Sequence, residues 1–173
     1  MKIAILGYSG SGKSTLAQLL AKTYCLPVLH FDTIQFLPDW VIRGTEEKQQ
    51  LTTAFLQEHD SWVIDGNYSK LSFDERMEQA DTIILLLFNR LSCFYRAYKR
   101  SRMYKNKTRP DMADGCTEKF DLEFAKWILW KGRSKETIER FQKVIDRYHE
   151  KVVVIRNQKD LDNYIKQLPK STT

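Results

Sequence analysis

Residues 7 to 14 form a glycine-rich stretch, Gly-Tyr-Ser-Gly-Ser-Gly-Lys-Ser, that follows an apolar run at residues 3 to 6. Its spacing fits the G-x-x-x-x-G-K-[ST] pattern, in which backbone N–H groups and the start of the next helix bind the phosphates of a nucleotide. In this pattern Lys13 reaches the β and γ phosphates, and the Ser14 hydroxyl is a ligand of Mg²⁺. The sequence therefore predicts a site for ATP and Mg²⁺.

The pattern assigns a role to nearly every residue of this loop. Glycine supplies backbone conformations, or a close approach, that a Cβ atom would prevent. A chance match in a chain of 173 residues is expected in roughly one per cent of cases or fewer. The apolar residues that follow recur at helical spacing until Pro27, as the pattern requires. The predicted phosphate-binding residues are Gly7, Ser9, Gly10, Ser11, Gly12, Lys13, Ser14 and Thr15.

Two acidic residues follow predicted strands. Asp65 ends the strand predicted at 61 to 64, which is the form of a Walker B element that organises the water shell of Mg²⁺. The alternative is a simple turn. Asp32 follows the strand predicted at 28 to 31, and it could accept a proton from an acceptor hydroxyl, contact Mg²⁺ through water, or cap the next loop. The predicted metal ligands are Ser14 and Asp65.

The segment from 33 to 44 carries groups that could shape a pocket for the acceptor. Phe36 and Trp40 could stack on a base or sugar, with Arg43 clamping a phosphate, or the two rings could instead pack the loop onto the core. His30, just before this segment, is expected to be a hydrogen-bonded core residue. The predicted substrate residues are Asp32, Arg43 and Asn67.

Eight of the 28 basic residues lie between positions 90 and 109, where no Asp or Glu occurs, whereas the rest of the chain has 20 basic and 22 acidic residues. One interpretation is a mobile helix on which Arg96 and Arg100 share a face and neutralise the charge of a phosphoryl group in transfer. A second is a nucleic-acid surface, where tyrosines among the cations stack on bases. The third is a solvated basic face. The predicted catalytic residues are Lys13, Asp32, Arg96 and Arg100.

Strands and helices alternate along the chain, which requires right-handed crossovers and hence a parallel sheet covered on both faces. Ligands bind beyond the carboxyl ends of such strands, where the polar residues described above gather. One expected helix begins at Thr45 and buries the stripe Leu51, Ala54 and Phe55. The strands are predicted at residues 3–6, 28–31, 61–64, 82–88 and 152–155, and the further helices at 72–80, 91–104, 134–148 and 160–168.

The composition, with 42% apolar and 29% charged residues, is that of a globular protein, and we expect one domain over residues 1–173. The longest apolar run, residues 83 to 88, is too short to span a bilayer, so we predict a cytoplasmic protein with no membrane partner. Three cysteines without C-x-x-C spacing indicate reduced thiols, and Cys25 and Cys93 are expected to be packing residues.

The N-terminal phosphate loop, the Asp65-Gly66 turn and the run from Ala80 to Arg90 before an arginine-rich helix resemble the adenylate-kinase-like P-loop kinases. More closely, residues 30–32, 62–68 and 109–118 resemble the bacterial DNA topology modulation proteins, over nearly the whole chain. The resemblance implies a three-layer α/β P-loop NTPase with a five-stranded parallel sheet in the order 2-3-1-4-5, ligands ATP and Mg²⁺, and a helical lid around residues 103 to 133.

The resemblance further implies a phosphotransferase that moves the γ-phosphoryl group of ATP to a small acceptor. Adenylate kinases follow the third strand with Asp-Gly-Phe-Pro-Arg, whose arginine holds the acceptor phosphate, whereas Asn67-Tyr68-Ser69 stands here. This departure argues against AMP as the acceptor. The alternatives are an ATP-dependent DNA-associated protein that uses the basic helix to contact nucleic acid, although no DNA-reading motif is present, or a plain ATPase.

Overall fold

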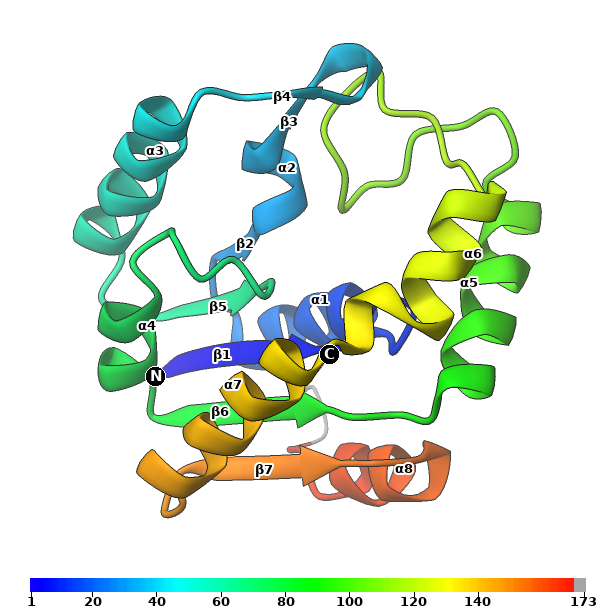
Figure 1. Cartoon of the computed structure of the whole chain (residues 1–173). Helices are drawn as coiled ribbons and strands as arrows, with labels where there is room; N and C mark the ends of the chain where they lie inside the picture. Colours follow the sequence, from blue (N-terminus) through cyan, green and yellow to red (C-terminus); the bar gives the residue numbers. More distant parts are fainter. Residues whose placement is uncertain (170–173) are drawn as a thin grey trace.

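The computed structural model describes residues 1–169 and shows a five-stranded parallel sheet between helices (Figure 1). The order along the sheet is β2-β5-β1-β6-β7. Numbered within this sheet alone, it is the predicted order 2-3-1-4-5, so the α/β three-layer prediction is confirmed. The strands are β1 (Lys2–Gly7), β2 (Val28–His30), β5 (Trp62–Asp65), β6 (Thr82–Leu86) and β7 (Val152–Ile155).

The fold has three layers, because a group of buried side chains on each face of the main sheet packs that face against helices. In β1, Ile3 and Ile5 belong to one group and Ala4 and Leu6 to the other, because successive residues of a strand point to opposite faces. A strand buried on both faces is therefore apolar throughout. The helices are α1 (Lys13–Tyr24), α2 (Phe31–Gln35), α3 (Thr45–Glu58), α4 (Phe73–Gln79), α5 (Arg90–Met103), α6 (Leu122–Leu129), α7 (Lys135–Arg147) and α8 (Gln158–Lys166).

The helices divide between the two faces. Helices α1, α5, α6 and α8 contribute side chains to the group that contains Ile5, and α2, α3, α4 and α7 contribute to the group that contains Leu6. None of the helices within residues 1–169 combines the length and the apolar character needed to cross a bilayer.

A second, two-stranded antiparallel sheet lies outside the main one and was not predicted. It pairs β3 (Phe36–Leu37) with β4 (Val41–Ile42) inside the segment that we expected to be a loop. Asp39 and Trp40 between the strands have positive φ angles of 60° and 64°. Strands of two residues show no alternation in the sequence, so the pattern could not reveal them.

The predicted buried stripe of α3 is wrong at two of its three residues, Leu51 and Ala54. Leu51 is 39% exposed, whereas the buried residues of this helix are Lys48, Thr52 and Leu56. The Thr52 hydroxyl donates to the Lys48 carbonyl at 2.8 Å, which satisfies a polar group inside the helix. Of the predicted stripe, only Phe55 packs against the core, and Ala54 is exposed like Leu51. Two of the three buried positions are polar, so hydrophobic periodicity placed the buried face incorrectly.

Cys25 was also assigned wrongly, because it is exposed at the end of α1 with φ 53°. Cys93 is buried as expected, and Cys116 is buried too.

Residues 104–121 connect α5 to α6 and lie beside the β3–β4 sheet (Figure 1). Met112, Ala113 and Cys116 of this segment form a small buried cluster with Phe36 and Trp40. The segment has only two isolated bridges, Lys105 to Glu118 and Thr108 to Thr117, so side-chain contacts hold most of it in place. These contacts bring it to the carboxyl-end edge of the main sheet, where the phosphate loop lies.

Candidate functional site

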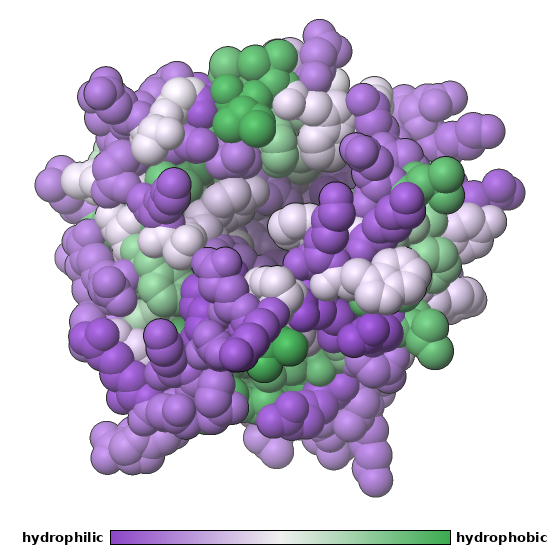
Figure 2. Space-filling view, viewed as in Figure 1, coloured by the Kyte–Doolittle hydropathy of each residue, from purple (hydrophilic) through white to green (hydrophobic). Residues whose placement is uncertain are grey.

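A cavity of about 1280 Å³ lies at the carboxyl ends of the central strands, and Figure 2 shows a hollow in the middle of this face with a mostly hydrophilic rim. Its walls come from the phosphate loop, α2, the turn after β5, α5 and the 104–121 segment. Ligand pockets usually measure roughly 300–1000 Å³, so this cavity has room for a nucleotide and a second small molecule. The loop residues that line it are Ser9, Gly10, Gly12, Lys13, Ser14 and Thr15.

Two glycines explain how the loop lies against its neighbours. Gly10 has φ +78°, and a Cβ atom there would lie 2.4 Å from the Cys93 carbonyl oxygen of α5. Gly12 precedes α1 with φ 99°, and no side chain caps this helix. The free N–H groups at the start of α1 are therefore available to an anion, together with the positive end of the helix dipole.

Lys13 extends its ammonium group across the loop, where Nζ donates to the Tyr8 carbonyl oxygen at 3.2 Å. Burial lowers the pKa of Lys13 below its usual 10.5, although the charges of Asp65 and Asp32 act in the opposite direction. The three side chains thus share one electrostatic environment. A polyphosphate in the loop would supply further negative charge and stabilise the ammonium form.

Asn67 holds the phosphate loop to the turn after β5. Its Oδ1 accepts from the Gly7 N–H at 3.0 Å, and its Nδ2 donates to the Gly7 carbonyl at 2.7 Å. Asn67 lines the cavity, but both ends of its amide are engaged by the loop backbone. These two hydrogen bonds fix the position of the phosphate loop relative to the turn after β5.

Arg96 lies against the phosphate loop. Its guanidinium donates to the Ser11 carbonyl at 2.9 Å and lies 4.3 Å from the ring centre of Phe88. Burial lowers the pKa of Arg96 from its usual value. A Cβ atom on Gly12 would approach this guanidinium to 3.1 Å, so Arg96 supports the side of the loop where phosphates are expected.

Asp65 is buried at the end of β5 and accepts a hydrogen bond from His30 Nδ1 at 2.7 Å. This is the hydrogen-bonded core position that we expected for His30. Within residues 1–169, no three His, Cys, Asp or Glu side chains come together as a metal site. Nucleotide-bound Mg²⁺ needs fewer protein ligands, because phosphates and waters complete its shell. A hydroxyl and a carboxylate, as at Ser14 and Asp65, fit that requirement.

The His30–Asp65 pair predicts how stability depends on pH. Burial alone would lower the pKa of His30, but the hydrogen bond and the charge of Asp65 raise it above the unfolded value of 6.5. The pair therefore contributes its full stabilisation below pH 6.5 and loses it as the pH rises through the folded-state pKa.

We expect the unfolding free energy of the wild-type protein, measured with urea, to fall from pH 6 to pH 8.5 by more than that of His30→Gln. Because glutamine does not titrate in this range, equal pH dependence in the two proteins would contradict the assignment.

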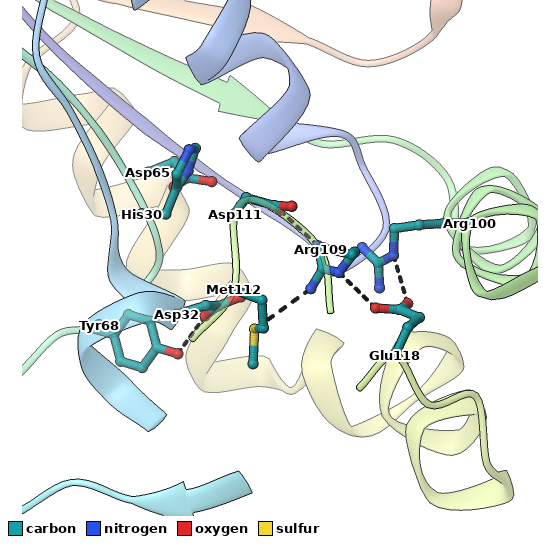
Figure 3. A network of polar contacts seen from close by, with 9 residues as sticks. All are labelled: His30, Asp32, Asp65, Tyr68, Arg100, Arg109, Asp111, Met112 and Glu118. Carbon is teal, nitrogen blue, oxygen red and sulfur yellow. Dashed lines mark hydrogen bonds and ion pairs between the residues drawn. The ribbon is translucent and has the colours of Figure 1, made fainter. Parts of the chain in front are cut away.

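Asp32 lies at the start of α2 and accepts a hydrogen bond from the Tyr68 hydroxyl at 2.6 Å (Figure 3). Burial, followed by the charge of Asp32, raises the pKa of Tyr68 above its usual value, so the phenol keeps its proton. The bond occupies Oδ1 of Asp32, and Oδ2 has no bond to any residue that the structure describes. The carboxylate can therefore accept a further hydrogen bond from a molecule in the cavity.

Arg100 and Arg109 share one buried carboxylate. Arg100 Nε lies 2.8 Å from Glu118 Oε1, and Arg109 Nε lies 2.6 Å from Glu118 Oε2 (Figure 3). Arg109 also pairs with Asp111 at 2.6 Å. The side chain of Glu118 is 2% exposed, so the 104–121 segment is tied to α5 through a desolvated charge network on the cavity wall.

The structure does not bring Arg43 to the cavity. Its Nε donates to the Ile34 carbonyl at 3.0 Å, and its guanidinium pairs with Glu47. The side chain thus closes the β3–β4 segment onto α2 and α3. We therefore exclude Arg43 from the substrate residues, because it does not line the cavity and its guanidinium contacts Ile34 of α2 and Glu47 of α3 instead.

The polar residues that line the cavity and were not predicted from the sequence include Gln35, Lys48, Tyr68 and Glu118. Tyr68 and Glu118 stand in the stretches that carried the family resemblance, so they were visible as motif residues without a role. Gln35 and Lys48 gave no signal, because the sequence did not show that α2 and α3 direct these side chains to one cavity.

The sheet order, the glycine-rich loop between β1 and α1 and the cavity beside it define an α/β protein of the P-loop class. No protein-family model and no curated protein matches the chain. Among solved structures, TT1252 from Thermus thermophilus is 16% identical, with 96% of this chain and 94% of that chain covered and a TM-score of 0.55. This similarity supports the fold alone.

A second solved structure, a gluconokinase from Sinorhizobium meliloti 1021, is 14% identical and has a TM-score of 0.48. The alignment covers 95% of this chain and 87% of the gluconokinase. At these values the gluconokinase gives no information on the substrate of the present chain.

Proposed function

We propose that the protein is a cytoplasmic, single-domain phosphotransferase of the kinase type, which transfers the γ-phosphoryl group of ATP to a small acceptor. The observation that carries this proposal is the cavity itself. It contains the phosphate-binding residues Lys13 and Ser14, the acidic residue Asp65, and, beyond them, a second acidic residue, Asp32. One cavity thus has two halves. The nucleotide half, at Lys13, Ser14 and Asp65, would bind the triphosphate, and the acceptor half, at Asp32, has room and a carboxylate for a second reactant.

In the nucleotide half of the site, positively charged groups would bind the negatively charged phosphates. The N–H groups of the loop and the Lys13 ammonium would hold the β and γ phosphates, and Ser14 with Asp65 would hold Mg²⁺. Mg²⁺ neutralises charge on the phosphate oxygens when it is bound. Arg96 supports the loop from the α5 side through the Ser11 carbonyl. We propose Arg96 as a positioning residue of the phosphate loop.

The acceptor half favours an alcohol over a phosphate. Asp32 is a carboxylate that accepts from Tyr68, and a second anion brought next to it would be repelled. A hydroxyl group can instead donate to its free oxygen. The acceptor oxygen then forms a bond to the γ phosphorus, the bond from this phosphorus to the β–γ bridging oxygen breaks, the hydroxyl proton passes to Asp32, and ADP leaves.

We further propose that residues 103 to 133 act as a lid. Arg109 lies in this segment and Arg100 lies just before it in α5, and both line the cavity. Guanidinium groups in that position stabilise the charge that develops on a transferring phosphoryl group. Glu118 would hold them in place, so that one closing movement delivers both.

Replacing Asp32 by asparagine tests the acceptor half. We expect kcat for phosphoryl transfer to fall by about 10²-fold, because the amide cannot take the proton, whereas ATP affinity should stay within about twofold. The measurement is ADP release in the presence of nucleosides, nucleoside monophosphates, sugars or small alcohols. Unchanged turnover in Asp32→Asn with an alcohol acceptor would remove the proton-accepting role.

A second candidate is an ATP-dependent protein that contacts DNA, as the resemblance to the topology modulation proteins suggests. It is favoured by one observation: Lys99, Arg102, Lys105 and Lys107 are exposed on and after α5. If this surface binds a duplex, neutralising these four cations should abolish binding and flatten its salt dependence. Binding without any phosphorylation of small molecules would favour this candidate over a kinase. A plain ATPase would release ADP at a rate that no acceptor changes.

A further inference from the structure

Lys48 is a buried cation with an incomplete set of partners. It lies in the first turn of α3, is 9% exposed and lines the cavity. Its ammonium has three donors, of which one reaches Gln35 Oε1 at 3.1 Å. Among the residues that the structure describes, no carboxylate lies within ion-pair distance of Lys48.

Such a lysine is unusual, because buried charges in proteins are normally paired. Arg109, another buried cation on the cavity wall, has two carboxylates, Asp111 and Glu118. An anion that enters the cavity would supply the partner that Lys48 lacks.

Gln35 completes a binding site for such an anion. A lysine can only donate, so its contact must be the amide oxygen of Gln35, which leaves the amide NH₂ group free of Lys48. This NH₂ group donates to no described residue, and Gln35 lines the same cavity. Two kinds of donor, an ammonium and an amide, are therefore available side by side to a carboxylate or a phosphate.

The distance between this anion site and Asp32 limits the size of the ligand. Asp32 and Gln35 are three residues apart on α2, and both line the cavity. Residues at this spacing have Cβ atoms roughly 5–6 Å apart on one face of a helix. A molecule that reaches both needs a hydroxyl group and an anionic group separated by a few carbon atoms. The rings of Phe36 and Trp40, whose centres lie 5.2 Å apart, also line the cavity.

We propose that the acceptor is a small alcohol that carries an anionic group, either a carboxylate or a phosphate, with this group bound by Lys48 and Gln35 and its hydroxyl at Asp32. The proposal rests on the phosphotransferase function above and adds the substrate class. The hydroxyl is phosphorylated as described, and the anionic group takes no part in bond making.

The test compares matched neutral and anionic alcohols. ADP release from Mg·ATP is measured with glycerol, glycerate and glycerol 3-phosphate, and with erythritol, erythronate and erythritol 4-phosphate. At least one anionic member should exceed its neutral parent in kcat/KM by at least about tenfold, since a hydrogen bond to a charged group is worth that much. Preference for the carboxylate or for the phosphate identifies which group the site takes.

Lys48 variants assign the preference to this site. Lys48→Met should remove the preference for anionic alcohols. It should lower kcat/KM for the anionic acceptor by at least about tenfold, whereas kcat/KM for the neutral parent should change by less than about twofold. Lys48→Arg keeps the charge and should retain most of the preference, and the exposed Lys22→Met is the matched control. Calorimetric Mg·ATP affinity, measured on every variant, shows that the fold is intact.

Three results would overturn the proposal: equal use of neutral and anionic alcohols, an equal loss for both in Lys48→Met, or no stimulation by any member while Mg·ATP still binds. The first two leave the phosphotransferase function in place. If Mg·ATP itself failed to bind, the proposed function would fall as well, so the two failures are distinguishable.

Discussion

Lys13→Ala is expected to lower kcat for phosphoryl transfer by about 10³-fold, because it removes the one ammonium that spans the phosphate loop. The charge that develops on the phosphate oxygens in the transition state would then be met only by the loop N–H groups, Mg²⁺ and more distant arginines. The rate is measured as ADP release with the best acceptor at saturating Mg·ATP.

The fold should survive this change. The Lys13 ammonium makes one hydrogen bond to the Tyr8 carbonyl and forms no ion pair with a described residue, so its removal breaks no ion pair, and buried Asp65 keeps its hydrogen bond from His30. Circular dichroism and the urea midpoint should stay close to wild type, and exposed Lys22→Ala should keep full activity. Turnover within about tenfold of wild type in Lys13→Ala would speak against a catalytic phosphate loop.

The second large effect concerns the charge network on the cavity wall. Glu118→Gln removes the carboxylate that Arg100 and Arg109 share, and breaking a buried ion pair costs about 3–5 kcal/mol. Because the 104–121 segment has few backbone bridges, we expect the cost to appear as opening of this segment. Amide hydrogen exchange within it should speed up by about 10²-fold, with KM for ATP rising as well.

Glu123→Gln is the matched control, since Glu123 is exposed in the first turn of α6. It should leave exchange in residues 104–121 unchanged. If exchange in Glu118→Gln were as slow as in the control, the segment would be held by its small apolar cluster alone, and Glu118 would not be the residue that fixes the two arginines.

Most of the sheet was predictable from the sequence because its strands are buried on both faces. Residues 3 to 6 and 83 to 88 are continuous apolar runs, which end at Gly7 and Asn89 respectively. The phosphate loop was equally visible, because its function depends on backbone conformations that only glycine adopts readily. These features are encoded locally, in residue types at fixed spacing.

The acceptor half of the cavity could not be predicted in the same way. Lys48 and Gln35 meet only because α2 and α3 pack beside each other, and nothing local in the sequence marks either residue. Arg43, which was predicted to contact the substrate, lies outside the cavity for the related reason that a polar side chain near a site can be taken up by the backbone. Such partners depend on how loops pack, which neither periodicity nor composition reports.

Binding of Mg·ATP to the phosphate loop is the claim on which all the proposed chemistry depends. Isothermal titration calorimetry of the wild-type protein with Mg·ATP is predicted to show one site per chain, with affinity reduced at least about tenfold in Lys13→Ala. Absence of any heat of binding to the wild-type protein, or identical affinity in the two proteins, would contradict nucleotide binding at this loop.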